Sequence, residues 1–65
     1  MKILLADIMY ERNLTVRQVS IMTGVPKSTI HNIMLEKTSP TLDTLAKISD
    51  GLKVSVNDLF EHNLS

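Results

Sequence analysis

The sequence has neither cysteine nor tryptophan, and its 65 residues include only two glycines and two prolines. Without cysteine, the chain forms no disulfide framework and no thiolate metal site. Few glycines and prolines, and no low-complexity run, argue against disorder. No apolar run approaches the roughly 20 residues that cross a bilayer, and Asp7 interrupts the apolar start too early for a signal peptide. We therefore expect one cytoplasmic domain over residues 1–65, with no membrane segment.

The residues that usually carry out catalysis are also scarce. His31 and His62 are the two histidines, and no aspartate or glutamate has the spacing to join either of them in a metal site. No glycine-rich phosphate loop is present, and so short a chain encloses a pocket with difficulty. The sequence predicts a protein that is not an enzyme and needs neither a metal nor a cofactor.

The charges balance, with seven basic and seven acidic residues, whereas nucleic-acid binders usually have a basic surplus. The distribution is uneven, because no acidic residue lies between Glu11 and Glu36 while Arg12, Arg17 and Lys27 do. A local basic face on a neutral protein is one interpretation. The alternative is that these charges only solvate the surface.

The 43% of hydrophobic residues fall mostly at helical spacing, and no segment alternates for long enough to indicate a strand. We predict an all-α compact bundle of about five short helices. The first spans about 2–12, the second begins at Thr15, and the third begins at Pro26 or Lys27. Thr41 and Ser55 begin the last two, and the fourth closes within residues 51–54.

Local signals support these boundaries. Thr15 and Gln18 have the spacing of a capping box, and Gly24 ends the second helix because it tolerates a tight turn. Pro26 suits the start of the third. The side chains expected to face inward are Leu5, Ile8, Met9, Ile30, Ile33, Met34, Leu42, Leu45, Ala46 and Ile48. Those expected on the outer face of the third helix are Ser28, His31, Asn32 and Leu35.

Three stretches in order carry a resemblance to a known family. They are Leu14-Thr15, Gln18-Val19, Gly24-Val25-Pro26-Lys27-Ser28-Thr29-Ile30 and Ile33; then Ser39-Pro40-Thr41-Leu42-Asp43-Thr44-Leu45 and Ile48; then Leu52-Lys53-Val54-Ser55-Val56-Asn57-Asp58-Leu59-Phe60. Together they resemble the Cro/C1-type, or Xre, helix-turn-helix family over nearly the whole chain. The resemblance implies a lambda-repressor-like fold, with the helix-turn-helix at about 15–35, that binds double-stranded DNA.

The resemblance also assigns contacts. A helix 10–12 Å wide fits the major groove, and the family's base-contact positions correspond here to Lys27, Ser28 and Asn32, with Thr29 and His31 nearby. Lys27 suits guanine O6 and N7, and Asn32 suits adenine N6 and N7. The phosphate contacts that it implies are Thr15, Arg17 and Gln18 at the second helix, and Lys37, Thr38, Ser39 and Thr41 after the third. The plainer alternative is a solvated polar face.

Departures from the family pattern are specific. Val16 stands where a glutamine is common, so that contact is lost. Methionine replaces both partners of a core arginine–glutamate pair, at Met9 and Met34, and we predict that these two side chains touch, since replacing a buried ion pair by apolar groups can be neutral or stabilising. Glu36 and Lys53 occupy positions where glycine is expected, so both turns are expected to be either strained or differently shaped.

Two functions of different kinds follow. The first is a sequence-specific transcriptional regulator, in its simplest form a repressor that occludes a promoter as a homodimer; the family's usual dimer region corresponds to residues 52–64. An antitoxin that regulates its own operon falls in the same class. The second is a protein-interaction module on the same fold with weak or no DNA binding, supported by neutrality and by exposed apolar side chains at Tyr10, Ile21, Met22 and Leu35.

Overall fold

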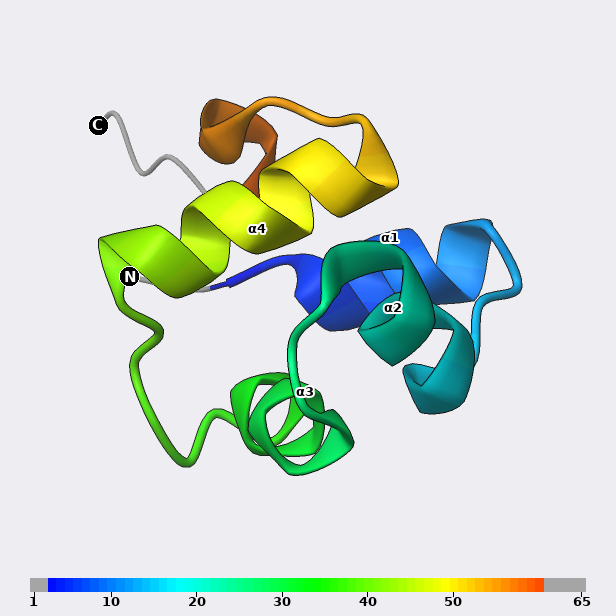
Figure 1. Ribbon diagram of the computed structural model, residues 1–65, viewed down its shortest axis with the longest axis horizontal. Helices are drawn as coiled ribbons and strands as arrows, with labels where there is room; N and C mark the ends of the chain where they lie inside the picture. Colours follow the sequence, from blue (N-terminus) through cyan, green and yellow to red (C-terminus); the bar gives the residue numbers. More distant parts are fainter. Residues whose placement is uncertain (1–2, 61–65) are drawn as a thin grey trace.

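The computed structural model describes residues 3–60, which form four α-helices and a 3₁₀ helix (Figure 1). The helices are α1 (Leu5–Glu11), α2 (Val16–Thr23), α3 (Lys27–Met34) and α4 (Leu42–Leu52), followed by η1 (Val56–Leu59). The predicted all-α bundle is confirmed, with a single 3₁₀ turn in place of the fifth helix. Within these residues no strand forms, although Ile3 and Phe60 make one antiparallel bridge. No helix of this part is long and apolar enough to cross a membrane.

Short polar side chains fix where the helices begin. The Thr15 hydroxyl accepts a bond from the Gln18 amide at 3.1 Å, and the Gln18 side chain accepts one from the Thr15 amide at 2.8 Å. This is the predicted capping box. Ser55 and Asp58 form a second, and Thr41 caps α4; each such cap stabilises by about 1 kcal/mol. The first helix has no side-chain cap and begins at Leu5, not at Lys2, which lies outside the described residues.

The turns between helices contain four residues in the left-handed region. Gly24, the C-cap of α2, has φ 76°, as its lack of a Cβ allows. Asn13, Glu36 and Lys53 have φ of 56°, 58° and 60°. A side chain in this conformation costs about 1–2 kcal/mol, less for asparagine, which bonds locally. Of the two alternatives expected at Glu36 and Lys53, a strained or a differently shaped turn, the positive φ values match the strained turn.

The core joins all five elements. Its buried members are Leu5, Met9, Val19, Val25, Ile30, Ile33, Leu45, Ile48, Leu52 and Leu59, and Ile8 and Met34 pack against them. The contact predicted between Met9 and Met34 stays a prediction. Two expectations were wrong, because Leu42 is 80% exposed and Ala46 is also exposed. The buried stripe of α4 follows Leu45, Ile48 and Leu52. Ala46 is rotated away from this stripe, and Leu42 is in the first turn, which extends beyond it.

The fourth helix ends at Leu52 with Lys53 as its C-cap, within the predicted range of residues 51–54, and Gly51 lies in its last turn. A Cβ at this position would lie 2.5 Å from the Met22 carbonyl oxygen and 2.7 Å from Thr23 Cα and Cγ2. Real Cβ atoms do not come this close to backbone atoms. Gly51 is therefore the point where α4 meets the last turn of α2, and glycine is required there for close approach.

Arg12 connects two helices that are distant in sequence. Its Nη1 donates a hydrogen bond of 2.6 Å to the Leu52 carbonyl oxygen at the end of α4. A cation at a helix C-terminus also interacts favourably with the helix dipole. The guanidinium thus links α1 to the last turn of α4.

The close contact at Gly51 predicts the sign of the stability change when this glycine is replaced by alanine. In an exposed helix, replacing glycine by alanine stabilises by about 1 kcal/mol. At this position we expect Gly51→Ala to lower the free energy of unfolding by about 1–3 kcal/mol through overpacking, measured by urea or thermal denaturation. Asp50→Ala, at the exposed neighbouring position, is the control and should change stability by less than about 0.5 kcal/mol. A Gly51→Ala variant as stable as the parent chain would contradict the close contact.

The left-handed turns yield a second prediction. Glu36→Gly and Lys53→Gly should each raise the free energy of unfolding by about 0.5–1 kcal/mol, because the relief of Cβ strain exceeds the added entropy of the unfolded chain. For so small a domain this is a rise in melting temperature of about 2–8 °C. Glu36→Ala and Lys53→Ala remove the charge but keep the Cβ. If the alanine variants gained as much stability as the glycine variants, charge and not backbone strain would be the cause.

Candidate nucleic-acid interface

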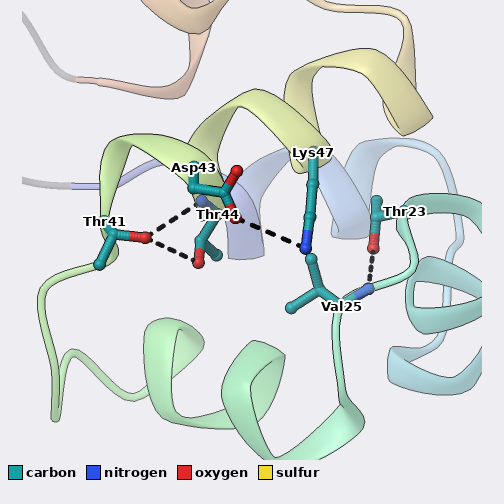
Figure 2. Close-up of polar contacts among 6 residues, drawn as sticks. All are labelled: Thr23, Val25, Thr41, Asp43, Thr44 and Lys47. Carbon is teal, nitrogen blue, oxygen red and sulfur yellow. Dashed lines mark hydrogen bonds and ion pairs between the residues drawn. The ribbon is translucent and has the colours of Figure 1, made fainter.

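The turn between α2 and α3 is held by side chains of α2. The Thr23 hydroxyl donates to the Val19 carbonyl oxygen at 2.7 Å and accepts from the Val25 amide at 3.2 Å, a bond shown in Figure 2. The Ser20 hydroxyl donates to the Val25 carbonyl oxygen at 2.7 Å. Both backbone polar groups of buried Val25 are therefore bonded to α2. This arrangement fixes the direction in which α3 leaves α2.

Sequence reasoning missed Ser20 and Thr23. The available signal was a pair of small hydroxyl residues in the last turn before Gly24, because such side chains commonly bond nearby backbone. The same arrangement recurs at the end of α4, where the Ser49 hydroxyl donates to the Val54 carbonyl oxygen. In both places a left-handed residue, Gly24 or Lys53, precedes the valine.

The third helix lies along the lower edge of the molecule in Figure 1, below α4. Its inner face buries Ile30 and Ile33 in the core. Lys27, Ser28 and His31 are exposed, as expected, whereas Thr29 and Asn32 are half-buried. All five base-contact candidates thus lie on one eight-residue helix, and the three most exposed are outward-facing donors or acceptors of hydrogen bonds.

The first turn of α3 leaves backbone donors available. Pro26 is its N-cap and no side chain caps it, and the first intrahelical bond runs from the Ile30 amide to the Pro26 carbonyl oxygen at 3.1 Å. The amides of Lys27 and Ser28 therefore have no intrahelical acceptor. Together with the Lys27 ammonium, they make this end of α3 attractive to acceptors and anions.

The phosphate-contact candidates lie on either side of α3. In Figure 1 the start of α2 lies to the right of α3, and the segment between α3 and α4 lies to the left. Thr15, Arg17 and Gln18 are exposed at the start of α2. Lys37, Thr38, Ser39 and Thr41 are exposed on the other side. The candidates are therefore gathered along one edge of the molecule, centred on α3.

The hydrogen bonds limit what some of these groups can donate. The Thr41 hydroxyl donates to Thr44 Oγ1 at 3.0 Å and accepts from the Thr44 amide at 3.2 Å (Figure 2). Its single proton is therefore committed within α4. In the capping box of α2, by contrast, the Thr15 hydroxyl and the Gln18 side-chain oxygen act as acceptors, so the Thr15 proton and the Gln18 amide protons remain for another partner.

The cations differ in availability too. Arg12 is engaged with α4, so it contributes less to a basic face than its sequence position suggested. Lys47 and Asp43 form an ion pair of 3.5 Å on α4, and residues 3–60 contain no other. Arg17, Lys27 and Lys37 are thus exposed and unpaired within this part of the chain. Val16 is half-buried against the core, consistent with its apolar character.

A hollow of about 300 Å³ lies beside this edge, between the N-terminal segment and the residues after α3. Ile3, Ile33 and Pro40 supply its apolar lining, and Glu36, Thr38 and Ser39 its polar part. Glu36 thus lines the same hollow as two of the phosphate-contact candidates, Thr38 and Ser39, and its negative charge opposes an anion there. Among residues 3–60 no group of three histidine, aspartate or glutamate side chains is placed to hold a metal ion.

The exposed apolar side chains lie where the sequence placed them. Tyr10 is 86% exposed on α1, Ile21 is 75% exposed on α2, and Met22 and Leu35 are exposed as well. These residues lie on α1, on α2 and at the C-cap of α3. Leu42, at the start of α4, is an exposed apolar residue that sequence reasoning had assigned to the core.

Comparison with known proteins agrees with this geometry. The model of the Cro/C1-type helix-turn-helix DNA-binding domain matches residues 5–65. Neither the curated proteins nor the solved structures include a match to the chain. The family model covers all the helices and the turn between α2 and α3, and so does not rest on the helix-turn-helix alone. The chain belongs to the family of Cro/C1-type helix-turn-helix DNA-binding domains.

Proposed function

We propose that this DNA-binding domain, over residues 1–65, is a sequence-specific transcriptional regulator that represses by occupying promoter DNA as a homodimer. The observation that carries the proposal is the exposed outer face of α3, held by the Val25 hydrogen bonds and flanked by two sets of phosphate-contact candidates. In helix-turn-helix domains the second helix enters the major groove, and its N-terminal residues contact base edges. Occlusion of a promoter requires nothing beyond DNA binding, so it is the simplest mechanism for this domain.

The roles assigned to α3 follow from chemistry. Lys27 donates to guanine O6 and N7, and Asn32 donates to adenine N7 and accepts from N6. Ser28, Thr29 and His31 are the supporting base contacts. Because Asn32 is half-buried, its amide has fewer accessible rotamers than a free side chain. Such restriction lowers the entropy lost when a bidentate contact forms.

The phosphate contacts hold the helix in register. At α2 they comprise Thr15, Arg17 and Gln18, with the amides of the first turn. On the other side they comprise Lys37, Thr38 and Ser39, with Thr41 at the start of α4. The Thr41 hydroxyl proton is bonded to Thr44. Thr41 therefore contributes to phosphate binding by its position at the N-cap of α4, where the first-turn amides of the helix attract an anion.

A second function is favoured by a separate observation. Tyr10, Ile21, Met22 and Leu35 are exposed, and the net charge is zero. These features suit a protein-interaction module or an antitoxin-like partner that keeps the fold and binds DNA weakly. The proposed location of either form is the cytoplasm.

Salt dependence separates the two functions. DNA binding through several phosphate contacts releases counterions, so affinity for duplex should fall steeply as salt rises. We expect a steep slope of log affinity against log salt, measured by fluorescence anisotropy with duplexes selected from a random pool. A flat response, or no binding at low salt, would contradict the regulator and favour the interaction module.

Paired substitutions distinguish residues that contact bases from residues that contact only phosphates. Asn32→Ala should cost about 1–3 kcal/mol and relax preference at one base position, because a bidentate contact is lost. Lys27→Ala should relax a different position. Arg17→Ala is the matched control: it should weaken binding to all sequences alike and reduce the salt slope by about 1. Repeating the duplex selection with each variant measures this, and an unchanged motif and affinity for Asn32→Ala would refute its assignment as a base contact.

A further inference from the structure

The outer face of α4 is unpartnered within the described residues and has an unusual charge order. Leu42, Asp43, Ala46, Lys47, Asp50 and Lys53 are all exposed, and we call these six residues the α4 face. Asp43 and Lys47 stand on the front of α4 in Figure 2, with no other element drawn over them. Leu42 is 80% exposed at one end of this face. A large apolar side chain so exposed at the end of a helix suits a contact with another molecule.

The charges along the α4 face alternate in sign. From the start of the helix they run Asp43, Lys47 and Asp50, followed by Lys53 at the C-cap, that is negative, positive, negative, positive. Read in the opposite direction, the order is positive, negative, positive, negative. An antiparallel copy of the same helix therefore places opposite charges against each other. In such a pair Asp43 lies opposite Lys53 of the second copy, and Lys47 lies opposite its Asp50. These contacts add to the exposed ion pair of 3.5 Å that Asp43 and Lys47 form within each helix.

We infer that the α4 face is the surface through which two copies of this chain associate, antiparallel and about a two-fold axis. A two-fold interface uses the same patch on both copies, so it must be self-complementary, and the charge order meets that requirement. Ala46 near the middle presents little bulk, which lets the two helices approach. Leu42 of each copy then packs near half-buried Val54 at the far end of the other.

The position of α3 fits this arrangement. A two-fold axis that relates two antiparallel helices lying side by side is perpendicular to both helices. In both figures α3 lies below α4, to one side of the α4 face. An axis running vertically in this view keeps the α3 helices of both copies on the same side. The pair thus offers two α3 outer faces in one direction, as a dimer on one face of a duplex requires.

The inference rests on the homodimer of the proposed function and names its surface. The family's usual dimer region, residues 52–64, overlaps the α4 face only at its end, and its part beyond Phe60 lies outside the described residues. Because exposed ion pairs are weak and screened by salt, the association should be weak in solution and should decline as salt rises. The two functions of the chain therefore separate: association needs α4, and base reading needs α3.

Charge exchange tests the inference without DNA. One variant, Asp43→Lys with Asp50→Lys, makes the α4 face wholly positive; the other, Lys47→Asp with Lys53→Asp, makes it wholly negative. Like charges placed opposite each other repel, so each variant alone should self-associate at least about tenfold more weakly than the parent chain. An equimolar mixture should recover the association as a heterodimer. Sedimentation equilibrium at low salt measures both, and circular dichroism verifies that each variant remains folded.

Matched control variants change the net charge by the same amount as the test variants, but at positions outside the α4 face. Asp7→Lys with Glu11→Lys on α1 adds the same charge as the first variant, and Arg17→Asp with Lys37→Asp removes the same as the second. These should associate more strongly than the variants of the α4 face. If the variants of the α4 face dimerise as the parent does, or their mixture fails to pair, the inference is overturned while a homodimer through another surface stands. A parent chain that is monomeric both alone and on its duplex overturns the inference and the homodimer together.

Discussion

The contact of Gly51 with the last turn of α2 is the constraint on which the position of α3 depends. Because position 51 has no Cβ, α4 approaches the Met22 carbonyl and Thr23 closely. Thr23 in turn holds the amide of Val25, two residues before α3 begins. The path from α4 to the outer face of α3 thus runs through one glycine, one threonine and one valine. A change at Gly51 would act on α3 without touching any residue of its surface.

The elements that the sequence predicted well have local causes. The capping box of Thr15 and Gln18, the end of α2 at Gly24 and the start of α3 after Pro26 each depend on neighbours within a few residues. The elements that it predicted poorly depend on distant partners. The bond from Arg12 to Leu52 spans 40 residues, and nothing around Gly51 in sequence reveals that Thr23 lies against it.

The error at Leu42 has a different cause. An apolar residue one position after a helix cap is consistent with either face, because the first turn extends beyond the buried stripe that Leu45, Ile48 and Leu52 define. The exposed residues of the candidate interface were easier to place, since polar side chains at the spacing of Ser28 and His31 lie on the face opposite Ile30. Only the hydrogen bonds of the structure show which hydroxyl protons remain available to a phosphate. The proton of Thr15 is available and that of Thr41 is not.

The hydrogen bonds of Val25 also bear on the thermodynamics of binding. Ser20 and Thr23 fix both polar groups of its backbone, so the torsions between α2 and α3 are set before any partner arrives. A preorganised surface loses less conformational entropy on association than a hinged one. The entropy that is lost therefore belongs mainly to the long exposed side chains of Arg17, Lys27 and Lys37. Loosening the turn, for example by removing the Ser20 hydroxyl, would lower the affinity of α3 for every DNA ligand equally, whatever the DNA sequence.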